Sequence, residues 1–140
     1  AVDLLRTVND NVERALIANG GRIVKRMGDG VMATTLDPNQ AVEGALTATE
    51  ALSGVEVEGF RPQLRIGIHS GRPRRLGGDY LGVDVNVAAR VMSRAKPGEV
   101  LVTVRACEQL DGERFTTGSP RHVSAPGAPE DLRVRPVSRR

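Results

Sequence analysis

A tight turn sequence, Gly28-Asp29-Gly30, separates two short runs of β-forming residues at positions 22–27 and 31–36. Asp-Gly and its neighbouring glycine favour positive φ, so the two runs are predicted to form an antiparallel hairpin with a carboxylate at its tip. Apolar residues at helical spacing precede this hairpin and end at Gly20-Gly21, which predicts a helix over residues 4–19. A helix followed directly by a hairpin favours a fold that mixes helices with antiparallel strands.

The rest of the chain continues this mixture. The expected elements after the hairpin are a helix over residues 37–54, a strand over 63–70, a loop over 71–82, a helix over 85–94, and strands over 100–104 and 132–137. Because Pro136 lacks the N–H that a central strand donates, the last strand is expected at a sheet edge.

This order of elements predicts an α+β sandwich of the ferredoxin-like kind, with an antiparallel-rich sheet and all helices on one face. Residues 1–140 suit one domain of ordinary size. The ferredoxin-like topology also needs a strand before the first helix, and the sequence, which begins at Ala1, opens inside the helical pattern instead. We therefore expect the first strand to be missing from this stretch.

Composition excludes several classes of protein. The three aromatic residues, Phe60, Tyr80 and Phe115, provide no stacking platform for nucleic-acid bases. A single cysteine, Cys107, excludes an intramolecular disulfide and a cysteine metal cluster, and the two histidines lack the spacing of zinc ligands. No apolar run is long enough to span a membrane and no signal segment opens the chain, so a soluble cytoplasmic domain is expected.

The charge is unevenly placed. Residues 1–120 hold 15 basic and 15 acidic side chains, whereas residues 121–140 hold 5 basic and 2 acidic ones, so the net charge of +3 lies in a basic tail with a possible edge strand. A neutral body argues against the nucleic-acid binding that a pI of 9.7 suggests. Only Lys25 and Lys96 are lysines, which makes each of them a candidate for a specific role.

Several polar residues have both a functional and a purely structural interpretation. Asp29 at the hairpin tip either binds a hard divalent cation or simply favours the turn. Asn86 and Arg90 share one face near the start of a helix, where they either grip a polyphosphate or face solvent. Asp79, between glycines, accepts from the exocyclic amine of a base or favours a turn. Five arginines without intervening acids either attract a triphosphate or form a solvated loop: Arg61, Arg65, Arg72, Arg74 and Arg75.

In order and spacing, these segments resemble the catalytic domain of class III nucleotidyl cyclases, the adenylate and guanylate cyclases, and most of all the bacterial adenylate cyclases. The segments that carry the resemblance are residues 20–33, 64–71, 78–90 and 97–103. The resemblance spans residues 4–110, with a looser match in the tail.

The resemblance implies roles for five residues. Asp29 matches one of two aspartates that hold two Mg²⁺ or Mn²⁺ ions, and Lys25 with Asp79 matches the pair that reads the purine. Lysine at this position implies adenine, because guanylate cyclases usually carry glutamate there. Asn86 matches the residue that orients the ribose, and Arg90 the one that stabilises charge on the phosphates in the transition state.

The implied reaction converts ATP to 3′,5′-cyclic AMP and pyrophosphate at sites shared by two head-to-tail subunits, so a homodimer is implied. The family's other metal aspartate lies on the strand before the first helix, and Pro126 stands where a lysine is expected to meet the triphosphate. This stretch alone is therefore expected to turn over weakly or not at all. The alternatives are a guanylate cyclase and a catalytically impaired regulatory or dimerisation module. In each case a sensor or regulatory domain, or a membrane protein that tethers the domain, could lie elsewhere in the full-length chain.

Overall fold

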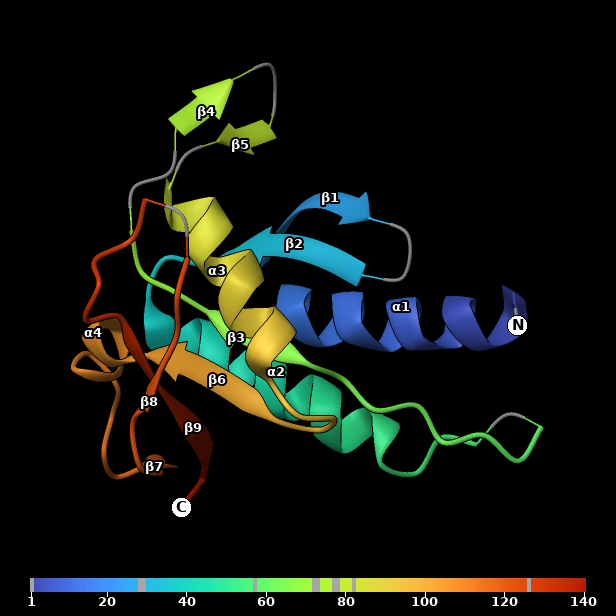
Figure 1. The fold of residues 1–140 in the computed structure, drawn as a ribbon. Coiled ribbons are helices and arrows are strands. Elements are labelled where there is room, and N and C mark those ends of the chain that lie inside the picture. Colours follow the sequence, from blue (N-terminus) through green and yellow to red (C-terminus); the bar gives the residue numbers. More distant parts are fainter. Residues whose placement is uncertain are drawn as a thin grey trace.

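The computed structural model describes residues 2–27, 30–56, 58–71, 74–76, 79–81, 83–125 and 127–140. The helices are α1 (Val2–Ala18), α2 (Pro38–Leu52), α3 (Val83–Arg94) and the short α4 (Val104–Cys107) (Figure 1). The strands are β1 (Arg22–Met27), β2 (Gly30–Thr34), β3 (Ile66–Ile68), β4 (Arg74–Leu76), β5 (Asp79–Leu81), β6 (Val100–Thr103), β7 (Phe115–Thr117), β8 (Arg121–His122) and β9 (Arg133–Arg139). Within the described ranges, no helix has the length and apolarity needed to cross a membrane.

The strands form one main sheet and two separate hairpins. The main sheet has the order β3-β6-β9-β7, and β8 also pairs with β9. β3 and β6 are parallel, whereas the other described pairings, including the hairpins β1–β2 and β4–β5, are antiparallel. The predicted α+β fold with an antiparallel-rich sheet is confirmed.

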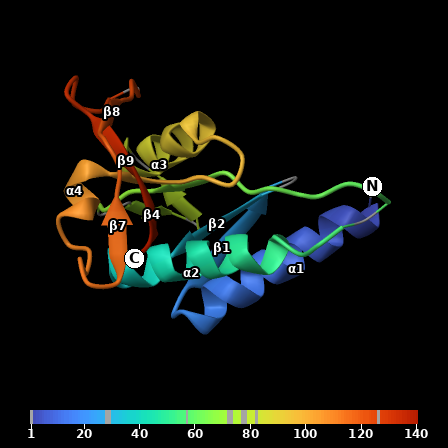
Figure 2. The same cartoon turned by 90° about the horizontal axis from the view of Figure 1, so that it is seen from below.

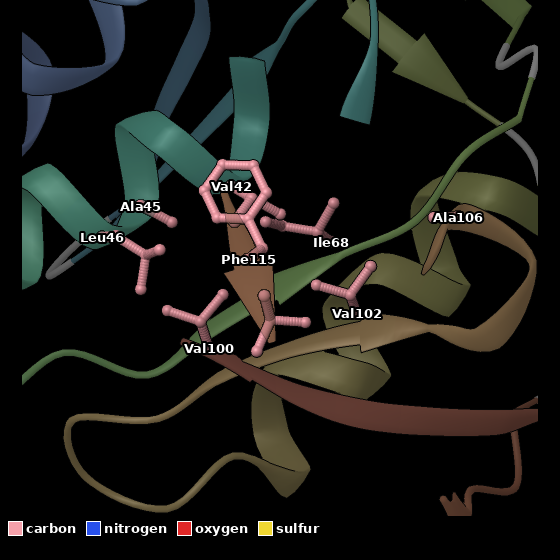
Figure 3. Packing of buried hydrophobic residues seen from close by; sticks show 9 residues of the cluster. Val42, Ala45, Leu46, Ile68, Val100, Val102, Ala106 and Phe115 are labelled. Carbon is pink, nitrogen blue, oxygen red and sulfur yellow. The ribbon is translucent and has the colours of Figure 1, made fainter. Parts of the chain in front are cut away.

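The helices cover both faces of the main sheet, so the expectation that all of them share one face is wrong. Val100 and Val102 of β6 belong to a buried cluster with residues of α2 (Figure 3), whereas Leu101 belongs to a second cluster with residues of α3. Because successive side chains of a strand point to opposite faces, α2 and α3 lie on opposite sides of β6, as Figure 2 shows. All four residues of β6 are buried, as expected for a strand covered on both faces.

The start of α2 follows the predicted signal. The Asp37 side chain accepts hydrogen bonds from the backbone N–H groups of Asn39 (2.8 Å) and Gln40 (3.2 Å), and Pro38 occupies the first turn, where its missing N–H costs nothing. This capping fixes the residue at which α2 begins after the β1–β2 hairpin.

The segment expected as a loop over residues 71–82 contains the β4–β5 hairpin, in which Asp79 pairs with Leu76. Both strands are only three residues long, and strands this short are hard to tell from a loop by sequence.

The last strand, β9, is central and not at an edge, because it pairs with β6 on one side and with β7 and β8 on the other. The backbone of Pro136 faces β7, where its carbonyl accepts from the N–H of Gly118 (2.8 Å). Because Pro136 has no N–H to donate, the Gly118 carbonyl accepts a hydrogen bond from Nη1 of Arg135 instead (2.9 Å). A side chain therefore replaces the missing backbone donor and lets proline occupy an internal strand.

Arginines of the basic tail, residues 121–140, form ion pairs with other parts of the fold. Arg139 at the end of β9 donates to the carboxylates of Glu43 and Glu50 on α2, and Arg121 of β8 pairs with Glu99 at 2.7 Å. The hydrogen bond from Arg139 holds the pKa of Glu50 below its ordinary value. The positive charge of residues 121–140 thus joins the last strands to the rest of the molecule.

Candidate functional site

Lys25 lies on β1 with an exposed side chain, paired in register with Met32 of β2. The register of the hairpin shifts between Ile23 and Lys25, which marks a bulge in the strand just before the lysine. Asp79 is the first residue of β5, and its side chain lies outside what the structure describes.

Asn86 and Arg90 lie one turn apart on α3, and both side chains are exposed. Nε of Arg90 donates to the backbone carbonyl of Ser124 at 3.1 Å. Among the described residues, Nε is the only nitrogen of the Arg90 side chain that makes a hydrogen bond. Both Nη nitrogens of the guanidinium therefore remain available to an anion. Arg90 is thus anchored at one point and exposed, and a planar guanidinium can bind phosphate oxygens in pairs.

The elements that carry these residues meet in space although they are far apart in sequence. β5 contacts both β1 and α3, so Lys25, Asp79, Asn86 and Arg90 lie on three neighbouring elements (Figure 1). Asp29 itself lies outside the described residues. The end of the hairpin where β1 finishes and β2 begins lies over α1, on the side away from α3 (Figure 1). These ends of β1 and β2 therefore lie apart from α3 within one chain.

The described residues contain no group of three or more His, Cys, Asp or Glu side chains that could hold a metal ion. Asp29 alone is one carboxylate, which does not fit two divalent cations that each need several oxygen ligands. Pro126 lies outside the described residues. Of two arginines on either side of it in the sequence, Arg121 is engaged by Glu99, whereas Arg133 is exposed.

A groove of about 1930 Å³ lies elsewhere, between the hairpin and the main sheet. Its walls include Val31 and Ala33 of β2, Ile66 and Ile68 of β3, and residues of the three long helices. Of the predicted site residues whose side chains the structure describes, Lys25, Asn86 and Arg90 do not line it. In the described part of the chain β2 pairs only with β1, and β3 only with β6, so each presents a strand edge to this groove.

One polar cluster was missed by sequence reasoning. The ring of His69 bridges two side chains, with Nδ1 3.0 Å from Oγ1 of Thr103 and Nε2 2.9 Å from Oδ1 of Asp84 at the start of α3. The available signal was the alternation of Gly67, His69 and Gly71, because small residues on the same side of a strand as a polar one indicate close approach of another element.

Cys107 is a packed residue. Its thiol donates to the carbonyl of Val102 at 3.7 Å, and burial raises its pKa above the ordinary value, which opposes reactivity. His122 bonds through Nε2 to the carbonyl of Glu130 at 2.6 Å. Neither residue forms a catalytic or metal cluster among the described residues.

Comparison with known proteins identifies one family. The family model described as "Adenylate and Guanylate cyclase catalytic domain" matches residues 1–133. A pH-sensitive adenylate cyclase of Mycobacterium tuberculosis is 34% identical over 122 residues, which are 83% of this chain and 30% of that protein. An adenylate cyclase of Streptomyces coelicolor is 39% identical over 93 residues, or 66% of this chain and 24% of that protein. The chain therefore spans less than a third of the length of these relatives.

Solved structures show the same fold. An adenylate/guanylate cyclase/hydrolase from Silicibacter pomeroyi has a TM-score of 0.74 at 30% identity, covering 90% of this chain and 77% of that one. An adenylate cyclase of Trypanosoma brucei, solved in its monomeric state, has a TM-score of 0.80 at 23% identity, covering 98% of this chain and 79% of that one. The second likeness concerns the fold alone.

Proposed function

The chain belongs to the adenylate and guanylate cyclase catalytic domain family, and on that basis we propose that it converts ATP to 3′,5′-cyclic AMP and pyrophosphate. The observation that supports the proposal is that β5 contacts both β1 and α3, because these three elements carry Lys25, Asp79, Asn86 and Arg90. We propose residues 1–140 as one catalytic domain of a longer protein.

Each residue has a role that suits its chemistry. The Lys25 ammonium donates to the adenine ring, and the Asp79 carboxylate accepts from the exocyclic amine. Asn86 holds the ribose, and Arg90 donates from its Nη nitrogens to the phosphate oxygens as their charge develops.

The reaction forms a bond between the ribose 3′-oxygen and the α-phosphorus and breaks the bond from that phosphorus to the bridging oxygen of the pyrophosphate. The 3′-hydroxyl proton passes to solvent, and the pyrophosphate leaves. Divalent ions, when bound, would offset charge on the attacking and leaving oxygens, and Asp29 would be one of their ligands.

The groove between β2 and β3 offers a place for a second carboxylate. We propose that a further strand, N-terminal to α1 in the longer protein, pairs with both strand edges and carries the other metal aspartate. Such a strand would satisfy the backbone groups of β2 and β3 and bury the apolar walls. The expected result is that a version of the protein that starts upstream of this strand binds Mn²⁺ more tightly than residues 1–140, as titration calorimetry would show.

The direct test is cyclic AMP formation from ATP with Mg²⁺ or Mn²⁺ by the full-length protein. Replacing Arg90 by Ala is expected to lower kcat by about 100-fold or more, since it removes fixed donors to the developing charge. Arg94→Ala, at the exposed end of the same helix, is the matched control and should leave the rate unchanged. A wild-type rate no higher than that of Arg90→Ala would reject the proposed activity.

A second candidate is a cyclase-like regulatory or dimerisation module without turnover. The lack of a metal-binding cluster among the described residues favours it. This module would bind ATP or form a dimer without releasing pyrophosphate, so a pyrophosphate assay beside a nucleotide-binding titration separates the two candidates.

A further inference from the structure

The start of α3 is tied to the main sheet by the bridge through His69. His69 follows β3, Thr103 ends β6, and Asp84 lies in the first turn of α3, so one imidazole connects three elements. The His69 and Asp84 side chains are 10% and 36% exposed, and Thr103 is 1% exposed. His69 and Thr103 are therefore largely shielded from water, and Asp84 is partly exposed. Hydrogen bonds shielded from water hold geometry more firmly than those at the surface.

The chemistry of the partners fixes the direction of one bond. An ionised carboxylate only accepts, so Nε2–H of His69 donates to Asp84. The Thr103 hydroxyl forms the hydrogen bond with Nδ1. The order Thr-His-Asp resembles a nucleophilic triad, but a hydroxyl that is 1% exposed has no access to a substrate. The bridge is consequently a positioning device.

Two glycines allow α3 to lie close to β3 and to the segment that follows it. A Cβ on Gly71 would lie 2.1 Å from Cγ of Asp84, and a Cβ on Gly67 would lie 2.3 Å from the backbone nitrogen of Met92. α3 therefore rests on bare backbone near both of its ends, with the Asp84 carboxylate seated over Gly71. Packing fixes the height of the helix above β3, and the hydrogen bond fixes its first turn.

We propose that Asp84 and His69 are positioning residues for α3, which set where Asn86 and Arg90 meet the nucleotide. This inference rests on the proposed function, because it assigns those two residues to the substrate. Asn86 lies two residues after Asp84 and Arg90 six after it, on the same rigid helix, so a shift of the first turn moves both. Misplacement of catalytic groups by about 1 Å costs about 100-fold in rate.

The test compares four variants of the full-length protein. Asp84→Ala removes the acceptor and is expected to lower kcat for cyclic AMP formation by about 10- to 100-fold, with KM for ATP changed by less than about threefold. Asp84→Asn keeps an oxygen that accepts from Nε2–H and should recover most of the rate. Gly71→Ala should behave like Asp84→Ala, because the new methyl group displaces the carboxylate.

The double variant provides the sharpest outcome. With Asp84 already replaced by Ala, a methyl group at position 71 meets no carboxylate, so Gly71→Ala/Asp84→Ala should equal Asp84→Ala alone. Additive losses in the double variant, or an Asp84→Asn enzyme as slow as Asp84→Ala, would overturn the inference.

Hydrogen exchange separates this inference from the proposed function. Asp84→Ala is expected to speed amide exchange at least about tenfold in the first two turns of α3 and to leave α2 unchanged. Unchanged exchange in α3 would refute the positioning role even in an active enzyme. Faster exchange in α3 together with a wild-type protein that forms no cyclic AMP would support the bridge and reject the cyclase activity.

Discussion

The choice between ATP and GTP depends on two side chains in our proposal. An ammonium group only donates, so Lys25 suits the acceptor nitrogen of adenine, whereas a carboxylate at that position suits the N–H groups of guanine. Lys25→Glu combined with Asp79→Gly is therefore expected to shift the ratio of kcat/KM from ATP toward GTP by about tenfold or more. Initial rates with each nucleotide measure the shift.

The other lysine provides the control. Lys96 is exposed in the turn after α3, so Lys96→Glu makes the same change of charge away from β1 and β5. It should leave the nucleotide preference as it is. A double variant that remains active with an unchanged ATP/GTP ratio would argue against the assignment of Lys25 and Asp79.

Single residues were predictable where their signal is local. Asn86 and Arg90 lie four positions apart on a strongly patterned helix, so their shared face follows from the sequence. The role of His69 does not, because its partners are 15 and 34 residues away along the chain. Only the fold brings Asp84 and Thr103 to the two sides of its ring.

The placement of α3 on β3 depends on Gly67. A Cβ there would lie 2.3 Å from the nitrogen of Met92 and 2.7 Å from the carbonyl oxygen of Ala88, both of them backbone atoms that cannot rotate away. Gly67→Ala is therefore expected to destabilise the protein by about 1–3 kcal/mol, as overpacking does, and to slow the reaction. Urea unfolding followed by circular dichroism measures the loss.

Gly54 is the matched control for this substitution. An added Cβ at Gly54 meets nothing within 4 Å, so Gly54→Ala should leave the unfolding midpoint unchanged or raise it slightly. Equal midpoints for the two alanine variants would show that α3 does not rest on the β3 backbone as described.

The contact between β9 and α2 makes stability depend on pH. Burial opposes ionisation of Glu43, but hydrogen bonds from Arg139 and Arg114 outweigh it, and the pKa of Glu43 lies below the ordinary 4.5. The hydrogen bond from Arg139 does the same for Glu50. A carboxyl group with a lowered folded-state pKa stabilises above its unfolded pKa and loses that contribution as the pH falls through the folded one. Stability should therefore fall below about pH 4.5.

Arg139→Ala should lower stability at pH 7 by about 1 kcal/mol, since all three side chains are partly exposed and screened. It should also flatten the dependence of the melting temperature on pH below 4.5, the ordinary value for these glutamates. Arg133→Ala on the same strand removes an equal charge from an exposed position and should do neither. A pH profile of Arg139→Ala parallel to that of the wild type would contradict the link between β9 and α2.

At the scale of the whole molecule, the three long helices, the first hairpin and strands β3, β6 and β9 were predictable, because periodicity and turn residues are local signals. The short elements β4, β5, α4, β7 and β8 were not predicted. The continuous apolar run in β6 indicates a strand buried on both faces but does not identify the helix on each face, so the placement of α2 and α3 had to come from the structure. The central position of β9 depends on Arg135 replacing a backbone donor for Gly118, and no rule about proline anticipates that.

The same arrangement bears on assembly. The end of β1 and the start of β2 lie over α1, away from α3, within one chain (Figure 1). Our proposal needs this hairpin and α3 to contribute to one site. A head-to-tail dimer would solve this problem, because the hairpin of one subunit could complete the site on α3 of the other. We therefore propose two equivalent sites in a homodimer, each with residues from both subunits.

Mixing two inactive variants of the full-length protein tests that proposal. Asp29→Ala should remove a metal ligand, and Arg90→Ala the phosphate donor, so each homodimer should be inactive. In an equal mixture half of the dimers are mixed, and each of these has one intact site of two, so about a quarter of the wild-type activity should return. Asn86→Ala mixed with Arg90→Ala is the control: both defects lie on α3, every site keeps one of them, and no activity should return. If Asp29→Ala and Arg90→Ala together give no more product than they give apart, each site is built from a single chain.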